Sequence, residues 1–220
     1  PYPGTGSGDC GSLNDWGLHI NEMTIDLRGD AGKTLTNIVF ENPDADPNAG
    51  FAIFAMNMVG MEPGVQCNDN AFCFGDGSGA DCPCLNFGGP CHGCANGADA
   101  EGGYLETQGI ASLSNDTVVL FAKDLVPNLP CLFFSGSNAI NGGMGIPFGD
   151  GLRCVGGAVR RLQIVNSDFT GAAQTTVDVA AQGGVVAGDL RRYQLWFTDP
   201  GTICGALFNL SNATELTWQA

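Results

Sequence analysis

Hydrophobic residues in the second half of the chain recur at alternate positions within short segments. Tyr193, Leu195 and Phe197 form one such set, and Leu162 and Ile164 follow the same spacing. A period of two is typical of a strand that buries one face. Turn-forming Asn, Gly and Pro residues separate these segments, and we expect strands at 104–106, 110–113, 117–122, 131–135, 144–148, 158–165, 174–179, 192–198 and 215–218. The pattern predicts an all-β fold, an antiparallel β-sandwich or jelly roll over residues 104–220.

The N-terminal residues 1–65 predict a smaller β region that begins with a Pro-, Gly- and Ser-rich arm. Residues 51–59 (FAIFAMNMV) are nearly all apolar, as expected of a strand that is buried on both faces. Three or four strands are too few to cover such a segment, so we expect it to gain cover from the second half or from another chain. The arm at 1–8 or the segment 18–27 is the candidate for a strand donated to a neighbouring subunit.

A Cys- and Gly-rich connector, residues 66–103, separates these two regions and has almost no hydrophobic periodicity. It cannot make its own core, so we expect disulfides to hold it. An even number of cysteines in a Gly-rich, Lys-poor chain indicates an oxidising, extracellular or cell-surface location. No export signal is visible at Pro1, and we expect a mature or truncated chain whose signal is gone. The ten disulfide candidates are Cys10, Cys67, Cys73, Cys82, Cys84, Cys91, Cys94, Cys131, Cys154 and Cys204.

The pairing of these cysteines stays open at this point. Neighbours within the connector are favoured, Cys10 is a candidate partner of Cys67, and Cys131, Cys154 and Cys204 are expected to share the C-terminal part. Zinc is the rival interpretation, because the connector also offers His92 among its thiols. The Cys82-Pro-Cys84 spacing is a poor match to the usual zinc knuckle, which favours disulfides.

Charged residues are scarce and mostly acidic. Only 14% of the chain is Asp, Glu, Lys or Arg, and 23 acids against 8 bases give a net charge of −15. Residues 34–122 contain no Lys or Arg and carry eleven acids. This balance argues against nucleic-acid binding, since little could neutralise the phosphates. No apolar run reaches the roughly 18 residues of a membrane helix. So low a charged fraction suggests that apolar surface is buried between subunits.

Catalytic constellations are not apparent, and we expect no enzyme. The two histidines, His19 and His92, lie in a predicted strand and in the connector, and Ser78 is not in a nucleophile elbow. Candidate carboxylate pairs for a glycosidase exist by residue type only. Calcium is the one cofactor that the sequence suggests, through the alternating oxygen side chains of Asp44, Asp46 and Asn48 and through the loop of Asp76. Plain Asx turns are the rival interpretation of both loops.

Three further groups of residues carry predictions about the surface. Asn115, Asn209 and Asn212 begin N-x-[ST] triplets and are candidate glycosylation sites. Two arginine doublets, 160–161 and 191–192, suggest salt bridges to Asp168 or Asp189. The aromatic residues that could form a sugar-binding platform, with burial as the alternative, are Trp16, Tyr104, Tyr193, Trp196 and Trp218.

Several motifs occur together in residues 72–218. They are CFGDGSG at 73–79 followed by Cys82-Pro-Cys84, PCLFF at 130–134, FGDGLRCVGG at 148–157, and YQLWFTDP at 193–200 with FNL at 208–210. This series resembles a Cys- and Gly-rich C-terminal β module of large secreted or cell-surface proteins of environmental bacteria. The resemblance implies an extracellular β domain with no assigned activity, and it carries no catalytic residue. Cys91 is an additional thiol relative to that pattern, and residues 1–65 lie outside it.

Together these features predict a secreted structural protein. We expect a self-assembling subunit of an extracellular filament or surface layer, joined to copies of itself by strand donation. The alternative is an adhesion module that binds calcium or carbohydrate, with Trp16 or Trp218 near the sugar. A secreted hydrolase is the third hypothesis.

Overall fold

The computed structural model describes residues 67–201 and 204–220. The chain divides into two compact units, Pro1–Met56 and Asn57–Ala220, and every described residue belongs to the second. The predictions for the N-terminal β region therefore lie outside the described residues. They comprise the arm, the segments 18–27 and 51–59, Cys10, Trp16, His19, Asp44, Asp46 and Asn48.

Strands are almost the only regular secondary structure in the described chain. The principal sheet has five strands in the order β1-β12-β11-β4-β9, and a second sheet has the order β10-β3-β2. Their pairings are antiparallel. The strands are β1 (Ala71–Phe72), β2 (Tyr104–Gln108), β3 (Val119–Lys123), β4 (Pro130–Gly136), β9 (Arg160–Asn166), β10 (Ala173–Gln174), β11 (Leu190–Thr198) and β12 (Phe208–Thr217).

Two small ribbons and two short helical turns complete the domain. β5 (Asn138–Ala139) pairs with β8 (Val155–Gly156), and β6 (Ile146–Phe148) pairs with β7 (Gly151–Arg153). The 3-10 turn η2 (Ile140–Gly143) follows β5, and helix α1 (Val179–Gly183) precedes β11. The prediction of an all-β, disulfide-rich fold is confirmed.

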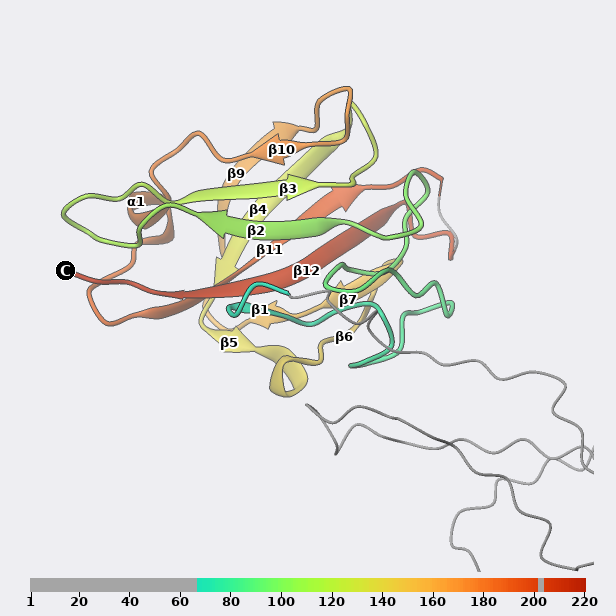
Figure 1. The fold of residues 1–220 in the computed structure, drawn as a ribbon, viewed down its shortest axis with the longest axis horizontal. Helices are drawn as coiled ribbons and strands as arrows, with labels where there is room; N and C mark the ends of the chain where they lie inside the picture. Colours follow the sequence, from blue (N-terminus) through green and yellow to red (C-terminus); the bar gives the residue numbers. More distant parts are fainter. Residues whose placement is uncertain (1–66, 202–203) are drawn as a thin grey trace, which may run out of the picture. The chain divides into compact units, whose positions relative to one another are not determined.

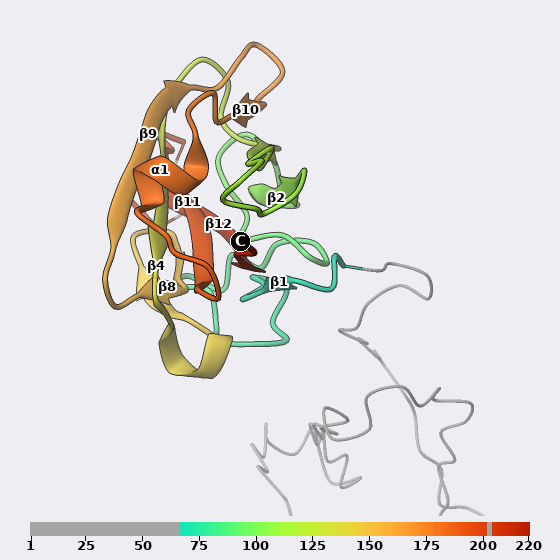
Figure 2. The ribbon, with the colours of Figure 1, turned by 90° about the vertical axis from the view of Figure 1, so that its left-hand side faces the viewer.

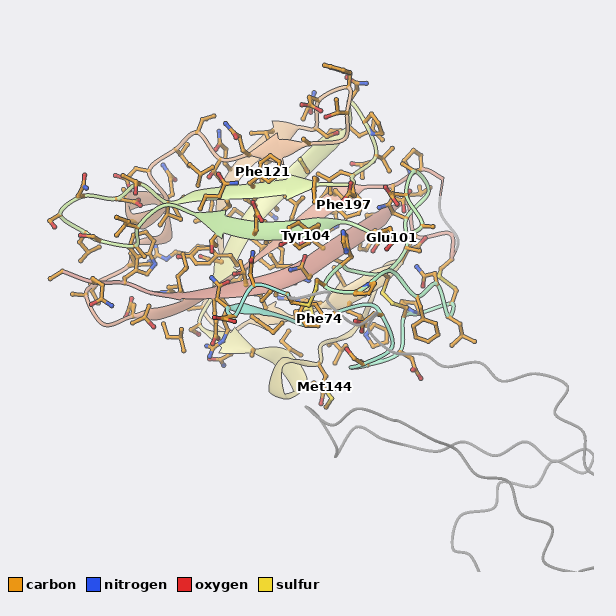
Figure 3. The ribbon with its side chains drawn as sticks, viewed as in Figure 1. Phe74, Glu101, Tyr104, Phe121, Met144 and Phe197 are labelled. Atoms are coloured by element: carbon orange, nitrogen blue, oxygen red, sulfur yellow. A yellow bond between two sulfur atoms is a disulfide. The ribbon has the colours of Figure 1, made fainter. Side chains whose placement is uncertain are left out.

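The two larger sheets lie face to face as two layers. In Figure 1 the sheet of β2, β3 and β10 lies in front of β4 and β11, and Figure 2 shows the layers nearly edge-on. Tyr104 and Phe121 belong to the front sheet, and Phe197 belongs to β11 behind it (Figure 3). A core of buried side chains fills the space between the layers. It includes Leu105, Leu120, Ala122, Phe133, Tyr193, Leu195, Phe197 and Trp218.

A second hydrophobic cluster occupies the other face of the five-stranded sheet. Phe133 belongs to the first core and its neighbour Phe134 to the second, because successive side chains of a strand point to opposite faces. The second cluster joins Phe134, Leu210 and Ala213 to residues of β7, β8 and the connector, namely Cys73, Cys82, Cys94, Leu152, Cys154 and Val155. Gly93 fits there because any Cβ would meet the backbone of Leu210 in β12.

Four disulfides bind the connector internally and to the sheets. Cys67–Cys91 and Cys82–Cys94 close loops within the connector, so the expected pairing inside the connector holds for four of its six cysteines. Cys73–Cys154 and Cys84–Cys204 join it to distant parts of the β domain, and β1 pairs with β12. The connector is thus part of the sandwich, although its composition differs sharply.

Three expectations about the cysteines are wrong. Cys67 pairs with Cys91, so it is not the partner of Cys10. Cys154 and Cys204 pair with connector residues and not with each other. Among the described residues, Cys131 forms no disulfide, because β4 buries it in the first core, where its thiol donates to the Val165 carbonyl at 3.3 Å.

Two errors in the predicted strands have clear local causes. Residues 110–113 form a loop with one isolated bridge, Ser112 to Gln219. The segment 174–179 is a strand only at its start, because Asp178 then caps α1 by accepting a hydrogen bond from the Ala181 amide at 2.7 Å.

Candidate functional site

An exposed apolar groove of about 500 Å³ lies on the outer face of the five-stranded sheet. This is the face opposite the front sheet, and β4 and β9 form the outer boundary of the described domain in Figure 2. β7 and β8 cover part of the face, and the groove is the part beside them that they leave open. Its lining is Pro130, Cys131, Leu132, Phe134, Phe148, Arg153, Arg161, Ile164, Trp196 and Leu210.

A register shift in β9 places Ile164 in this groove. Phe133 pairs with Gln163 and Phe134 with Arg161, so Leu162 has no partner in β4. The extra residue breaks the alternation, as a β-bulge does. Leu162 is therefore buried in the first core while Ile164 is 67% exposed on the opposite face. The expectation that both residues share one buried face is wrong for this reason.

An aromatic row forms one wall of the groove. The ring centroids of Trp196 and Phe208 lie 5.5 Å apart, and those of Phe208 and Phe148 lie 5.2 Å apart. The Arg153 guanidinium stands over the Phe148 ring at 5.8 Å, which is within the range of a cation–π contact. Phe148 remains 43% exposed at the end of the row. Trp196 and Phe148 line the groove and Phe208 contacts both rings, so the row presents an apolar aromatic surface to solvent.

The charges around the groove are all positive. Arg153 and Arg161 are its only charged lining residues. Arg153 donates to the Val155 carbonyl at 3.3 Å, and neither arginine pairs with an acid among residues 67–201 and 204–220. In a chain of net charge −15, this apolar surface therefore presents two arginines that have no acidic partner in the described part of the chain.

The groove adjoins an open sheet edge. Within the described chain, β9 pairs with β4 alone, so the backbone groups on its other side have no strand partner. Gln163 and Thr176 exchange two hydrogen bonds of 2.8 Å on the inner side. On the outer side, Arg161 and Ile164 are exposed. A seven-residue edge beside an apolar groove is an arrangement that can accept an added strand.

Cys131 contributes to the groove without being reactive. Its side chain is almost wholly buried, and burial raises the pKa of the thiol to about 11. The thiolate, which is the nucleophile, is therefore scarce near neutral pH.

The metal predictions gain no support from the described part of the chain. Asp76 accepts hydrogen bonds from the Ser78 amide at 2.9 Å and the Ser78 hydroxyl at 2.5 Å, which is a plain Asx turn. Cys82, Cys84, Cys91 and Cys94 are all in disulfides, so the zinc alternative is wrong. No group of three or more His, Cys, Asp or Glu side chains that could hold a metal occurs among the described residues.

Both ring nitrogens of His92 lie near oxygen atoms of neighbouring residues. Its Nδ1 lies 2.7 Å from the Pro90 carbonyl, its Nε2 lies 3.3 Å from Asp124 Oδ2, and its ring packs against Tyr104 at 5.0 Å. Ser78 donates to Asp76 in the Asx turn, whereas the hydrogen-bond partners of the His92 ring are Pro90 and Asp124.

Two of the three glycosylation candidates are wrong. Asn209 and Asn212 are fully buried in β12, and their side-chain amides donate to the carbonyls of Ala95 at 2.9 Å and Leu105 at 3.0 Å. A glycan on either nitrogen would break these bonds and would find no space. Asn115 lies exposed in the loop before β3 and stays a prediction.

The predictions for the aromatic residues and for the arginines are partly wrong. Trp218 and Tyr193 are fully buried, and the indole donates to the Tyr193 hydroxyl at 2.8 Å, so neither can serve a sugar platform. Trp196 is half-buried in the groove wall. Arg191 pairs with Asp189 at 3.1 Å as predicted, while the partner of Arg192 is Glu215 at 3.0 Å.

The groove as a whole was not predicted, because its residues come from β4, β6, β7, β9, β11 and β12. The one signal in the sequence was Trp196, which falls on the face of its strand opposite Tyr193, Leu195 and Phe197. The longest helix in the described residues, α1, has five residues, and none of these residues forms a helix able to cross a membrane. Searches with protein-family models, against curated protein sequences and against solved structures found no match to this chain.

Proposed function

We propose that the chain is a secreted structural protein without enzymatic activity, a subunit that assembles with copies of itself into an extracellular filament or surface layer. The observation that carries this proposal is the exposed apolar groove beside the open edge of β9. A stable domain that leaves such a surface uncovered gains free energy when another chain covers it.

The disulfides support the extracellular part of the proposal. Four disulfides among the described residues are consistent with an oxidising compartment, since disulfides are rare in reducing ones. The motif resemblance to secreted β modules agrees with this placement.

The composition supports the structural part. Only 14% of the residues are charged, against about 25% in an average globular protein, and this low fraction favours apolar surface that is buried between subunits. The large buried side chains Tyr193 and Trp218 serve the core and not a substrate.

The adhesion-module alternative has less support. A carbohydrate site needs several convergent hydrogen-bonding groups, and the groove offers two arginines among apolar side chains. The calcium candidate that the structure describes, Asp76, is satisfied within its own turn. A melting temperature that rises with calcium or a glycan and falls with a chelator would favour this alternative.

Sedimentation velocity of the full chain, followed by negative-stain microscopy, tests the proposal. We expect species much larger than the 22.7 kDa monomer, with a regular repeat in the images. A monodisperse monomer at high protein concentration would refute self-assembly.

A further inference from the structure

We propose that the groove and the outer edge of β9 receive residues 51–59 of a second copy of the chain as an added strand. This inference rests on the proposed self-assembly and names the surface and the segment that perform it. It differs from the expectation that the arm or segment 18–27 is donated. The length, apolar surface and positive charge of the groove and of the β9 edge favour residues 51–59 instead.

The length of the acceptor edge matches the segment. β9 has seven residues, which extend about 23 Å at the usual rise of a strand, and nine residues extend about 30 Å. The segment can therefore pair along the whole of β9 with one residue to spare at each end. Its sequence, FAIFAMNMV, contains no Pro to interrupt the ladder and no Gly to weaken it.

Residues 51–59 would present mostly apolar side chains on both faces of a strand added beside β9. In a strand, Ala52, Phe54, Met56 and Met58 share one face, and this face is wholly apolar. Placed beside Ile164, these side chains would extend into the groove and cover its exposed surface. The opposite face, with Phe51 and Ile53 among its members, would adjoin the inner side of β9.

The charges are complementary. Arg153 and Arg161 line the groove without acidic partners among the described residues, and Arg160 is exposed at the start of β9. Residues 34–122 contain no Lys or Arg, so the segment and its surroundings carry only acids, the nearest being Asp46 and Glu62. Opposite charges on the two surfaces favour encounter.

Other occupants fit the groove less well. An anionic polymer would need more cations than two arginines on a chain of net charge −15. The contact between a donor segment and a different acceptor surface is heterologous, so repeated docking extends into a filament unless the rotation closes. This geometry is the one that the proposed function requires.

Two defective variants of the full chain test the inference. Ile164→Lys blocks the acceptor, and its stability cost is small because this side chain is mostly exposed. Val186→Lys is the matched control, since Val186 is a β-branched residue that is 60% exposed and lies outside the groove. The donor variant combines Ile53→Asp with Phe54→Asp, which places a charge on each face of the segment.

We expect wild type and Val186→Lys to assemble alike in sedimentation velocity. Ile164→Lys and the donor variant should each remain monomeric, with association weakened by about a hundredfold or more, as for a central interface residue. Mixed in equal amounts, the two should form a 1:1 complex of twice the monomer mass and nothing larger, because each retains one intact surface. Formation of this complex also shows that both variants are folded. Arg161→Glu is a second acceptor variant and should weaken assembly.

The possible failures are distinguishable. If wild type is monomeric, both the proposed function and this inference are overturned. If Ile164→Lys assembles like wild type, assembly does not use the groove. If the donor variant assembles like wild type while Ile164→Lys does not, the groove is used but residues 51–59 are not its occupant. Either of the last two results overturns this inference and leaves self-assembly intact.

Discussion

The disulfide framework allows a prediction from loop length. Cys73–Cys154 closes a loop with a sequence separation of 81, whereas Cys82–Cys94 closes one of 12. By the entropy of loop closure, the longer bond contributes about 4.5 kcal/mol to the free energy of unfolding and the shorter about 2.8 kcal/mol. All four cysteines are buried in the second hydrophobic cluster, so replacing either pair by Ala removes similar packing.

The double variants Cys73→Ala/Cys154→Ala and Cys82→Ala/Cys94→Ala isolate this difference. Urea unfolding, monitored in the Ile164→Lys background to suppress assembly, should show that the first variant is less stable than the second by about 1.7 kcal/mol. An equal loss, or a larger loss in the second variant, would show that loop entropy does not govern the stability of this framework. A change in the m-value would indicate that the denatured state expands when a bond is removed.

Two further predictions concern buried polar groups. Tyr193→Phe leaves the buried indole N–H of Trp218 without its acceptor, which should cost about 1–3 kcal/mol and lower the melting temperature by roughly 2–10 °C; an unchanged melting temperature would contradict this. Burial raises the pKa of Asp199, so the folded state holds this proton more tightly than the unfolded state does. Its contribution to stability is thus complete below the unfolded pKa of about 3.9 and is lost as the pH rises through the folded pKa. Asp199→Asn removes this pH dependence. In urea titrations between pH 4 and pH 7, the free energy of unfolding of the variant should therefore rise relative to that of wild type. A fall relative to wild type over the same range would contradict the prediction.

The fold class could be predicted because several segments with strand-forming sequences are strands in the structure. Strands near 104–106, 117–122, 131–135, 158–165 and 192–198 were all predicted, because each carries β-branched or aromatic residues between turn residues. In these segments local preference and tertiary packing agree.

β12 shows where such reasoning fails. It is the longest strand in the described residues, with ten residues, yet only its end was predicted. Its centre contains Asn209, Ser211, Asn212 and Thr214, all buried, where the pattern leads one to expect apolar side chains. Asn209 and Asn212 are satisfied by backbone groups of the connector and of β2. No local signal reveals partners that lie more than 100 residues away.

The groove could not be predicted either, because it also depends on contacts between segments that are distant in the sequence. The sequence suggests no role for Arg153, a salt bridge for Arg161 and a buried face for Ile164. Only the register shift opposite Phe133 and Phe134 turns Ile164 outward beside Arg161. A bulge of this kind depends on the pairing of two strands and leaves no mark in either sequence alone.

Amide hydrogen exchange of β9 tests the central claim most directly. Full chains under assembling conditions are compared with Ile164→Lys monomers, and exchange is followed in peptides that cover Arg160–Asn166. If a second copy completes the sheet, these amides should exchange much more slowly in the assembly, together with those of residues 51–59. Equal exchange in assembly and monomer would show that the edge stays open and that this surface does not join the subunits.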